Sequence, residues 1–330
     1  MAEATTVELD AQYRQLREEC GLLDRSARGK LLFSGPDAAE YLQGQLTNDI
    51  EALEPGDGCY SALLDRKGHM QADMRVLRAS AVPLPQITRE RNSGSLFFVD
   101  TEPEGLAAAR RHLEMYKIGR EVEMADVTAE MAILSLIGPR SAEVAGSPPL
   151  PEHACEAASI AGVDCLVAGT RDGIDLIALA GDTERLRTAL LNAGANEVGS
   201  EAVEILRVES GIPRFGAEMG NQTMPAEAGI VEAAISFTKG CYIGQETVAR
   251  LHYKGRPNRL LRGLILDAPA EPGTPLLLGE KEVGSVGTAC VSPAHGPIAL
   301  AIVRREAEPD VELAVGEDGV KARVVDLPFG

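Results

Sequence analysis

The sequence predicts an α+β protein that ends in a small β-barrel. Over roughly the first 258 of its 330 residues, apolar strand-like segments and helical segments mix irregularly, which favours α+β over a regular βαβ repeat. After about Arg259 the pattern changes to short apolar segments cut by Gly and Pro, which is typical of a small all-β barrel. Hydrophobic residues make up 45% of the chain and charged residues 25%, as in ordinary globular proteins, so a largely disordered chain is excluded.

The first helices and strands are predicted from periodicity and from the residues at their ends. Pro36 and Asp37 suit the first turn of a helix that continues to about Gln45. Asp65 and Gly68 are typical of a type I turn, which joins a strand at 59–64 to a returning strand at 69–77. Further helices are expected at 11–20 and 103–117, and further strands at 29–33 and 96–100.

The middle of the chain continues the same mixture. We expect strands at 131–137, 163–168 and 174–180, and helices at 183–193 and 200–210. The segment from about Gly211 to Gly240 is rich in Gly, Pro, Asn and Thr and has no sustained period, and long loops of this kind are often functional. Because the pattern changes to short strands after about Arg259, we predict two domains: residues 1–258, an α+β region, and residues 259–330, the barrel.

Charge and cysteine content limit the function classes. The net charge of −18 argues against direct nucleic-acid binding, which needs a broad cationic face. The longest apolar run, Ile298 to Val303, is far too short for a membrane helix, and the acidic N-terminus has no secretory pattern. We expect a cytoplasmic protein whose six cysteines are reduced thiols, mostly core residues, and no metal site, because no cysteine or histidine spacing fits a ligand set.

The most unusual segment is Lys239-Gly240-Cys241-Tyr242-Ile243-Gly244-Gln245-Glu246. Glycines let a backbone or a ligand approach closely, and a cationic neighbour such as Lys239 lowers the pKa of a thiol and favours the reactive thiolate. Composition alone also allows an inert cysteine beside a tight turn, and it favours that alternative.

The same region is basic. Between Lys239 and Arg262 the chain has six basic residues and one acid, a net charge of +5 in an acidic protein. This asymmetry indicates either a site for an anionic small molecule or a solvated strand edge kept soluble by arginines.

The strand from His69 separates two faces. Met70, Ala72, Met74 and Val76 share one face and are predicted to be core. On the other face, Asp73 would serve as an acid or base if it were desolvated. A solvated face with an ion pair between Asp73 and Arg75 is the simpler prediction.

Arg207 and Glu209 close the last helix before the long loop. They would either pair with each other or point at a ligand under the loop. A carboxylate suits a ring edge that presents N–H and NH₂ groups.

Together these segments resemble the YgfZ group of folate-binding proteins, which is related to the aminomethyltransferase (T-protein) of the glycine cleavage system. The stretch KGCYIGQETVAR is similar to the YgfZ signature. AEYLQGQLTNDI (39–50), LLDRKGHMQADMRV (63–76) and RVESGIPRFG (207–216) are similar to segments found in the wider family. The resemblance implies a three-part cloverleaf around a central folate cavity, with residues 1–258 forming two interleaved subdomains and a small barrel following.

The resemblance also implies roles for single residues. Glu209 would hold the pterin edge of tetrahydrofolate or a derivative, and Asp73 would lie near its reactive nitrogens. The candidate catalytic residues are therefore Cys241 and Asp73, and the candidate cofactor-binding residues are Glu209, Arg207, Lys239, Tyr242, Gln245, Arg250 and Arg256. From charge alone, the basic stretch from Arg250 to Arg262 would attract the glutamate tail of folate.

Three functions follow from the resemblance. T-proteins typically carry two adjacent aspartates after a glycine pair, whereas the run from Gly68 to Asp73 keeps one of each, and T-proteins lack the cysteine motif. This favours a folate-binding auxiliary factor that uses the Cys241 thiol in maturation or repair of iron–sulfur enzymes, including tRNA-modifying ones, with those enzymes or assembly factors as partners. The alternatives are an aminomethyltransferase that moves a one-carbon unit onto tetrahydrofolate, and a non-catalytic scaffold that binds a client protein.

Overall fold

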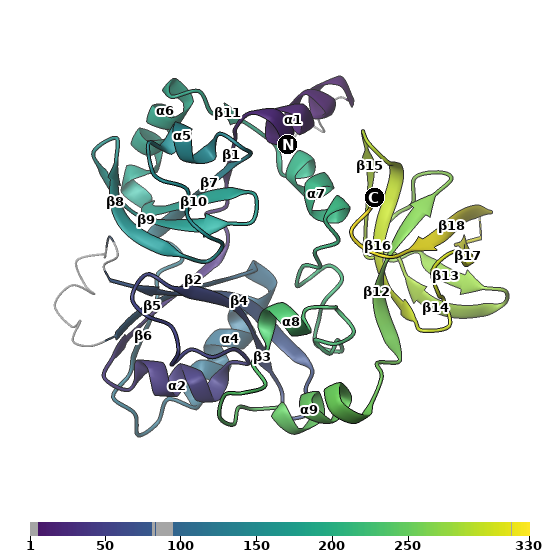
Figure 1. The fold of residues 1–330 in the computed structure, drawn as a ribbon, viewed down its shortest axis with the longest axis horizontal. Helices are drawn as coiled ribbons and strands as arrows, with labels where there is room; N and C mark the ends of the chain where they lie inside the picture. Colours follow the sequence, from purple (N-terminus) through teal and green to yellow (C-terminus); the bar gives the residue numbers. More distant parts are fainter. Residues whose placement is uncertain (1–5, 81–82, 84–94, 318) are drawn as a thin grey trace. The chain divides into compact units, whose positions relative to one another are not determined.

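The computed structural model describes residues 6–80, 83, 95–317 and 319–330, and these divide into two units. Unit 1 comprises Met1–Leu64, Gln71–Gly199 and Ala233–Ile243, and unit 2 comprises Asp65–Met70, Ser200–Glu232 and Gly244–Gly330. Figure 1 labels the helices and strands of both. Among the described residues, no helix is long and apolar enough to span a membrane.

Unit 1 contains two sheets. The first is five-stranded, in the order β3-β4-β5-β2-β6, and the second is six-stranded, in the order β11-β1-β7-β10-β9-β8. Their strands are β1 (Gly21–Asp24), β2 (Gly29–Gly35), β3 (Gly58–Leu64), β4 (Met70–Ala79), β5 (Ser95–Thr101), β6 (Glu123–Asp126), β7 (Met131–Ile137), β8 (Cys155–Ile160), β9 (Val163–Thr170), β10 (Gly173–Leu179) and β11 (Asn196–Glu197).

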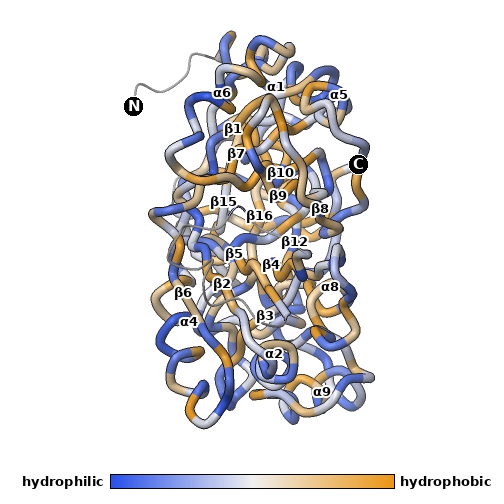
Figure 2. The backbone as a smooth tube through the Cα atoms, turned by 90° about the vertical axis from the view of Figure 1, so that its left-hand side faces the viewer, coloured by the Kyte–Doolittle hydropathy of each residue, from blue (hydrophilic) through white to orange (hydrophobic). Residues whose placement is uncertain are grey.

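Helices cover the outer faces of the two sheets. Helices α2 (Ala38–Gln45) and α4 (Pro103–Met115) bury Leu42 and Leu113 against the five-stranded sheet. Helices α5 (Ser141–Ala145) and α6 (Thr183–Asn192) pack on the six-stranded sheet, and α1 (Thr6–Glu18) buries Leu16. Unit 1 is therefore a four-layer helix–sheet–sheet–helix arrangement. Hydrophobic segments run along strands such as β7 and β10 in Figure 2.

The two sheets of unit 1 meet through an apolar layer. Leu32, Leu77 and Phe98 of the five-stranded sheet pack with Ile133 and Ile177 of the other. In strands, residues two positions apart point to the same side. The residues two positions before or after these apolar ones therefore continue the same layer, and several of them are charged.

Unit 2 contains the C-terminal barrel. Strand β12 pairs with β18 and also with β16, which closes the ring β12-β18-β17-β13-β14-β16, and β15 is added at β16. These strands are β12 (Arg259–Leu266), β13 (Pro275–Leu278), β14 (Lys281–Ser285), β15 (Thr288–Ser292), β16 (Gly296–Arg304), β17 (Glu312–Val315) and β18 (Val320–Val325). The predicted fold class, α+β with a C-terminal barrel, is confirmed.

Helix α7 (Ser200–Glu209) packs against the outside of this barrel. Val208 is fully buried against Ile298 and Leu300 of β16. That contact fixes the end of α7, where Glu209 lies, beside the end of β15.

Two short helices complete the fold: α8 (Val231–Ala234), whose residues fall partly in each unit, and α9 (Gln245–Lys254) in unit 2. Gly244 precedes α9 with a φ of 87°, a conformation that glycine adopts without strain.

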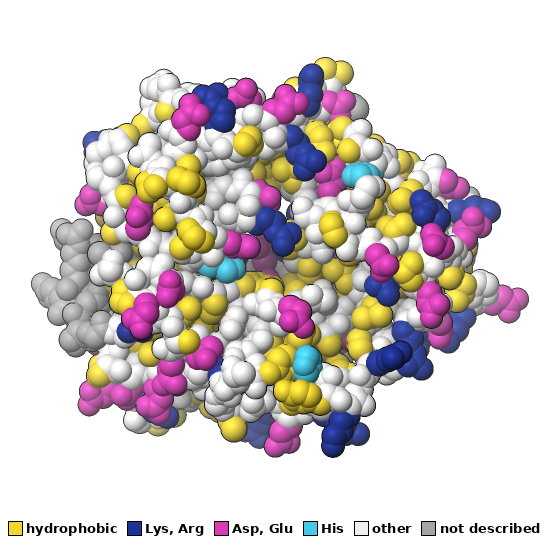
Figure 3. Space-filling model, in the orientation of Figure 1, with side chains coloured by type: hydrophobic (Ala, Val, Ile, Leu, Met, Phe, Trp, Pro, Cys, Tyr) yellow, Lys and Arg dark blue, Asp and Glu magenta, His cyan; other side chains and the backbone are white. Residues whose placement is uncertain are grey.

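The turn predicted at 65–68 is present, with the amide of Gly68 donating to the carbonyl of Asp65 over 3.0 Å. On the face in view in Figure 3, acidic and basic side chains are interspersed.

Candidate functional site

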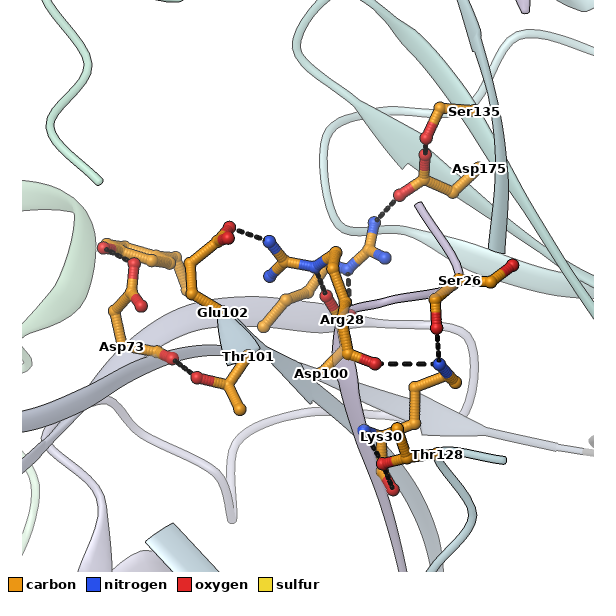
Figure 4. A network of polar contacts seen from close by, with 12 residues as sticks. Ser26, Arg28, Lys30, Asp73, Asp100, Thr101, Glu102, Thr128, Ser135 and Asp175 are labelled. Carbon is orange, nitrogen blue, oxygen red and sulfur yellow. Dashed lines mark hydrogen bonds and ion pairs between the residues drawn. The ribbon is translucent and has the colours of Figure 1, made fainter. Parts of the chain in front are cut away.

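One end of the layer between the two sheets of unit 1 is ionic. The guanidinium of Arg75 donates to Asp100 and to Asp175, both over 2.8 Å, and so bridges the two sheets. Arg28 Nε donates to the other oxygen of Asp100 over 2.6 Å, and Arg28 Nη1 donates to Glu102. Ser135 Oγ donates to Asp175 over 2.5 Å. Figure 4 shows this chain of alternating charges, which we call the ionic ladder.

Backbone pairing within each sheet places four members of the ladder opposite one another in pairs. Arg75 of β4 is directly opposite Asp100 of β5, and Asp175 of β10 is directly opposite Ser135 of β7. Lys30 of β2 also lies opposite Asp100, and its buried ammonium donates to the carbonyls of Ser26 and Arg28. Strand register therefore places these side chains, whereas Arg28 and Glu102 join the ladder from positions just outside β2 and β5.

Asp73 lies at one end of this ionic region and is buried. Tyr60 donates its hydroxyl to Asp73 Oδ2 over 2.8 Å, while Asp73 Oδ1 has no hydrogen-bond partner among the described residues. Burial raises the pKa of Asp73 to about 6, against the opposing effects of the Arg28 charge and the Tyr60 hydrogen bond. A carboxyl group with a pKa near neutrality and one unused acceptor atom is suited to exchanging a proton with a bound molecule.

The prediction of a solvated face with an Asp73–Arg75 ion pair is wrong. Asp73 and Arg75 are both buried, and Arg75 pairs with Asp100 and Asp175 instead. The physical reason is that the second sheet covers the polar face of β4. The condition set for Asp73 to act as an acid or base, desolvation, is met.

Glu209 of unit 2 is buried at the end of α7 and accepts a hydrogen bond from Ser292 Oγ over 2.5 Å. The same Ser292 Oγ accepts from the amides of Ala294 and His295. Since two amides approach the oxygen of Ser292, its single hydrogen points to Glu209 and fixes the direction in which that carboxylate faces.

Arg207 does not pair with Glu209. Its five N–H groups are taken up by Glu204, Glu218, Thr288 and the carbonyl of Ile212. The guanidinium is therefore a brace between α7, the following loop and β15. This arrangement leaves it no donor for the cofactor-binding role that the sequence suggested.

Lys239 is also engaged within the fold. Its ammonium donates to the carbonyls of Gln43, Leu46 and Asn48 over 2.5, 2.6 and 3.0 Å, and lies 5.1 Å from the centre of the Tyr242 ring. Burial lowers the pKa of Lys239 to about 8. We expected Lys239 to activate Cys241, but the Lys239 ammonium is instead bound by carbonyls of the last turn of α2 and of the segment that follows it.

Cys241 is the exposed member of the six cysteines. Burial raises the pKa of the other five thiols to about 11 or 12: Cys20, Cys59, Cys155, Cys165 and Cys290. Within the described part of the chain, no three His, Cys, Asp or Glu residues come together to hold a metal ion. Exposure therefore distinguishes Cys241 from every other thiol of the chain.

The basic stretch is partly neutralised by acids far away in sequence. Arg259 pairs with Glu227 over 2.9 Å, and Arg262 pairs with Asp326 over 3.2 Å. Arg250 and Arg256 are exposed, and Gln245 is half-buried at the start of α9. The net charge of +5 counted along the sequence therefore overstates the charge that this region presents.

Sequence reasoning missed Tyr60, Arg28, Asp100, Glu102 and Asp175 as members of the ionic site. One signal was available: Asp175 is the single charged residue in the strand GIDLIAL, and a charge inside an otherwise apolar strand indicates a buried partner. No comparable signal marks Arg28, which lies in the turn before β2.

The fold of this chain is that of a known class of proteins, as a comparison with solved structures shows. The crystal structure of the glycine cleavage system aminomethyltransferase T from Bartonella henselae matches this chain with a TM-score of 0.86, covering 100% of this chain and 91% of that one at 23% identity. The two chains therefore share one fold.

Two family models match the sequence: the GCVT N-terminal domain over residues 3–239 and the glycine cleavage T-protein C-terminal barrel domain over residues 259–329. The chain belongs to this glycine cleavage T-protein family. A Rubrobacter xylanophilus protein named aminomethyltransferase is 31% identical, over 97% of this chain and 86% of its own length. A Symbiobacterium thermophilum protein of the same name is 29% identical, over 96% and 88%.

These relatives confirm the wider family and leave the YgfZ subgroup as a prediction. They support the aminomethyltransferase alternative better than the iron–sulfur maturation function, for which they offer no evidence.

Proposed function

We propose that this chain binds tetrahydrofolate and transfers a one-carbon unit onto it in the manner of an aminomethyltransferase, with Asp73 as the proton-transferring residue. The observation that carries the proposal is the buried carboxyl of Asp73, whose pKa is raised to about 6 and whose Oδ1 has no partner among the described residues. Such an atom fits an N–H donor of a reduced folate.

The donor set of unit 2 also fits the group. Glu209 is buried, and Ser292 holds its direction, as expected of a carboxylate that receives the N–H and NH₂ groups of a pterin edge. When bound, tetrahydrofolate supplies the two nitrogens that accept the methylene carbon.

The chemistry assigned to the chain is proton transfer. Moving a methylene from an aminomethyl thioether to two folate nitrogens breaks one C–S and one C–N bond and forms two C–N bonds. Two nitrogen-bound hydrogens leave the folate, one ending on the thiol and one on ammonia. Asp73 accepts such a proton and returns it to a leaving group, and Tyr60 holds its second oxygen in place. We place this activity in the cytoplasm.

The test combines binding and turnover. Wild type, Asp73→Asn and Glu209→Gln are titrated with tetrahydrofolate by calorimetry and then assayed for ammonia release from an aminomethyl-lipoyl carrier protein. We expect Asp73→Asn to bind normally and to lose about 100-fold in rate, because it loses its proton-transfer group. We expect Glu209→Gln to bind about tenfold or more weakly, because a charge-assisted hydrogen bond is lost.

The matched control is Glu143→Gln, which removes an exposed carboxylate paired with Arg140 and leaves both properties unchanged. A wild-type protein that does not respond to tetrahydrofolate, or an Asp73→Asn variant that releases ammonia at the wild-type rate, contradicts the proposal.

One observation favours a second candidate function, the auxiliary role in iron–sulfur enzyme maturation. Cys241 is the exposed thiol of the six, and a redox or transfer role requires an accessible sulfur. We expect iodoacetamide to modify native wild type mainly at Cys241, and Cys241→Ala to fail to restore iron–sulfur enzyme activity in a deletion strain, whereas Cys59→Ala, which removes a half-buried thiol, still restores it. Full complementation by Cys241→Ala rules this candidate out.

A further inference from the structure

The positive charge of Arg28, a member of the ionic ladder, lowers the pKa of Asp73, but Arg28 forms its ion pairs with Asp100 and Glu102. It comes from the turn between β1 and β2, and its donors are directed to Asp100 on β5 and to Glu102 immediately after β5. Figure 4 shows Glu102 between Asp73 and Arg28. The guanidinium is thus held from two sides by carboxylates while its charge acts on a third.

Asp73 is held by other groups. Its side chain accepts from Tyr60 on β3, and its backbone carbonyl accepts from Thr101 Oγ1 over 2.5 Å. No ion pair of Asp73 occurs within the described ranges, whereas Asp100 beside it has two. A carboxylate bonded directly to arginine is held ionised, and Asp100 accordingly has its pKa lowered to about 2: burial raises it, and Arg75 and Arg28 together outweigh burial.

We propose that Arg28 is a positioning residue for proton transfer by Asp73: clamped between Asp100 and Glu102, it fixes a positive charge beside Asp73 without bonding to it, and so sets the pH at which Asp73 exchanges its proton. The inference rests on the proposed function for its role in catalysis. Its electrostatic part concerns the free protein alone.

The pKa of Asp73 is set chiefly by burial and by three neighbouring side chains. Burial raises the pKa of Asp73, Arg28 and the Tyr60 hydroxyl lower it, and Glu102 raises it. Arg75, two residues along β4, has its charge balanced by Asp100 and Asp175. Removing Arg28 therefore raises the pKa of Asp73 in two ways. The cation that stabilises the ionised carboxylate is lost, and the negative charge of Glu102 is no longer balanced by its arginine partner.

The experiment measures the titration of Asp73 directly in ligand-free protein. The carboxyl carbons of aspartate are labelled with ¹³C, and the resonance of Asp73 is identified by its loss in Asp73→Asn. We expect Arg28→Met to raise the midpoint by at least about one pH unit and Arg28→Lys to restore most of it. The matched control is Arg110→Met, which removes an exposed arginine paired with Asp126 and leaves the midpoint unchanged.

Glu102→Gln provides a second, independent variant with the opposite sign. Glu102→Gln removes the carboxylate that raises the pKa of Asp73, so the titration midpoint of Asp73 is expected to fall. This variant replaces Arg28→Met in the experiment if Arg28→Met does not fold. An unmoved midpoint in Arg28→Met, or in Glu102→Gln where the first variant is unfolded, overturns the proposal.

The pH profile of ammonia release separates this proposal from the proposed function. If the NMR midpoint and the acidic limb of the rate profile move together, both hold. If the midpoint moves and the wild-type protein shows no turnover, the electrostatic role of Arg28 stands and the proposed function fails. If turnover occurs and its acidic limb stays fixed while the midpoint moves, Arg28 does not position the proton transfer.

Discussion

Replacing Arg75 by methionine is expected to lower the free energy of unfolding by about 3–5 kcal/mol, because it leaves buried carboxylates without the cation they share. Arg75 is buried and bonds to Asp100 of one sheet and Asp175 of the other. Burial opposes the charge of Arg75, but the two carboxylates outweigh burial and raise its pKa. Methionine fills a similar volume without a charge, so packing is largely kept. Urea denaturation followed by circular dichroism at pH 7.5 measures the change.

Arg140→Met is the matched control for this prediction. Arg140 also bonds to two carboxylates, those of Glu19 and Glu143, but all three side chains are exposed. Its removal is expected to cost less than about 1 kcal/mol. The double variant Arg75→Met/Asp175→Asn is expected to recover part of the loss, because one unpaired buried charge is gone. Equal losses for Arg75→Met and Arg140→Met would show that the ladder does not hold the two sheets together.

The sequence predicts the apolar half of the site well. Alternation in β4 assigns Met70, Ala72, Met74 and Val76 to the core, and all four are buried. This succeeds because the pleat of a strand fixes which side chains share a face, whatever the rest of the chain does. The barrel is predicted for a similar local reason, since its strands are short and its turns are marked by Gly and Pro.

The ionic ladder could not be predicted from the sequence in the same way, because its ion pairs join segments that no local sequence pattern relates. Arg75 and Asp175 come from different sheets, and their pairing follows from how those sheets stack. The alternation that predicts a core on one face of β4 predicts water on the other, and only the second sheet excludes that water. Arg207 and Arg259 show the same limit: each is paired with an acid, Glu218 and Glu227 respectively, that lies in the long loop after α7.

Asp73→Asn is expected to stabilise the protein near neutral pH by up to about 3 kcal/mol. The folded-state pKa of about 6 lies roughly two pH units above the ordinary value of 3.8, and each unit corresponds to about 1.36 kcal/mol. Between these two values the folded protein binds more protons than the unfolded chain, so stability falls as pH rises through this window. Above about pH 7 the cost of the buried charge is complete, and asparagine, which still accepts from Tyr60, removes it.

The sign of the pH dependence is the decisive part of this prediction. Urea denaturation of wild type and Asp73→Asn at several pH values should give free energies of unfolding that converge below about pH 4, separate progressively between about pH 4 and 6, and stay a constant distance apart above about pH 7. If Asp73→Asn were instead less stable than wild type above about pH 6, with the difference shrinking towards acid, Asp73 would be a stabilising ionised group like Asp100, and its assignment as a proton-transfer residue would fail. A more stable Asp73→Asn protein that also releases ammonia about 100-fold more slowly would be the trade of stability for activity that the proposed function implies, because the buried carboxylate would then cost stability while it serves the reaction.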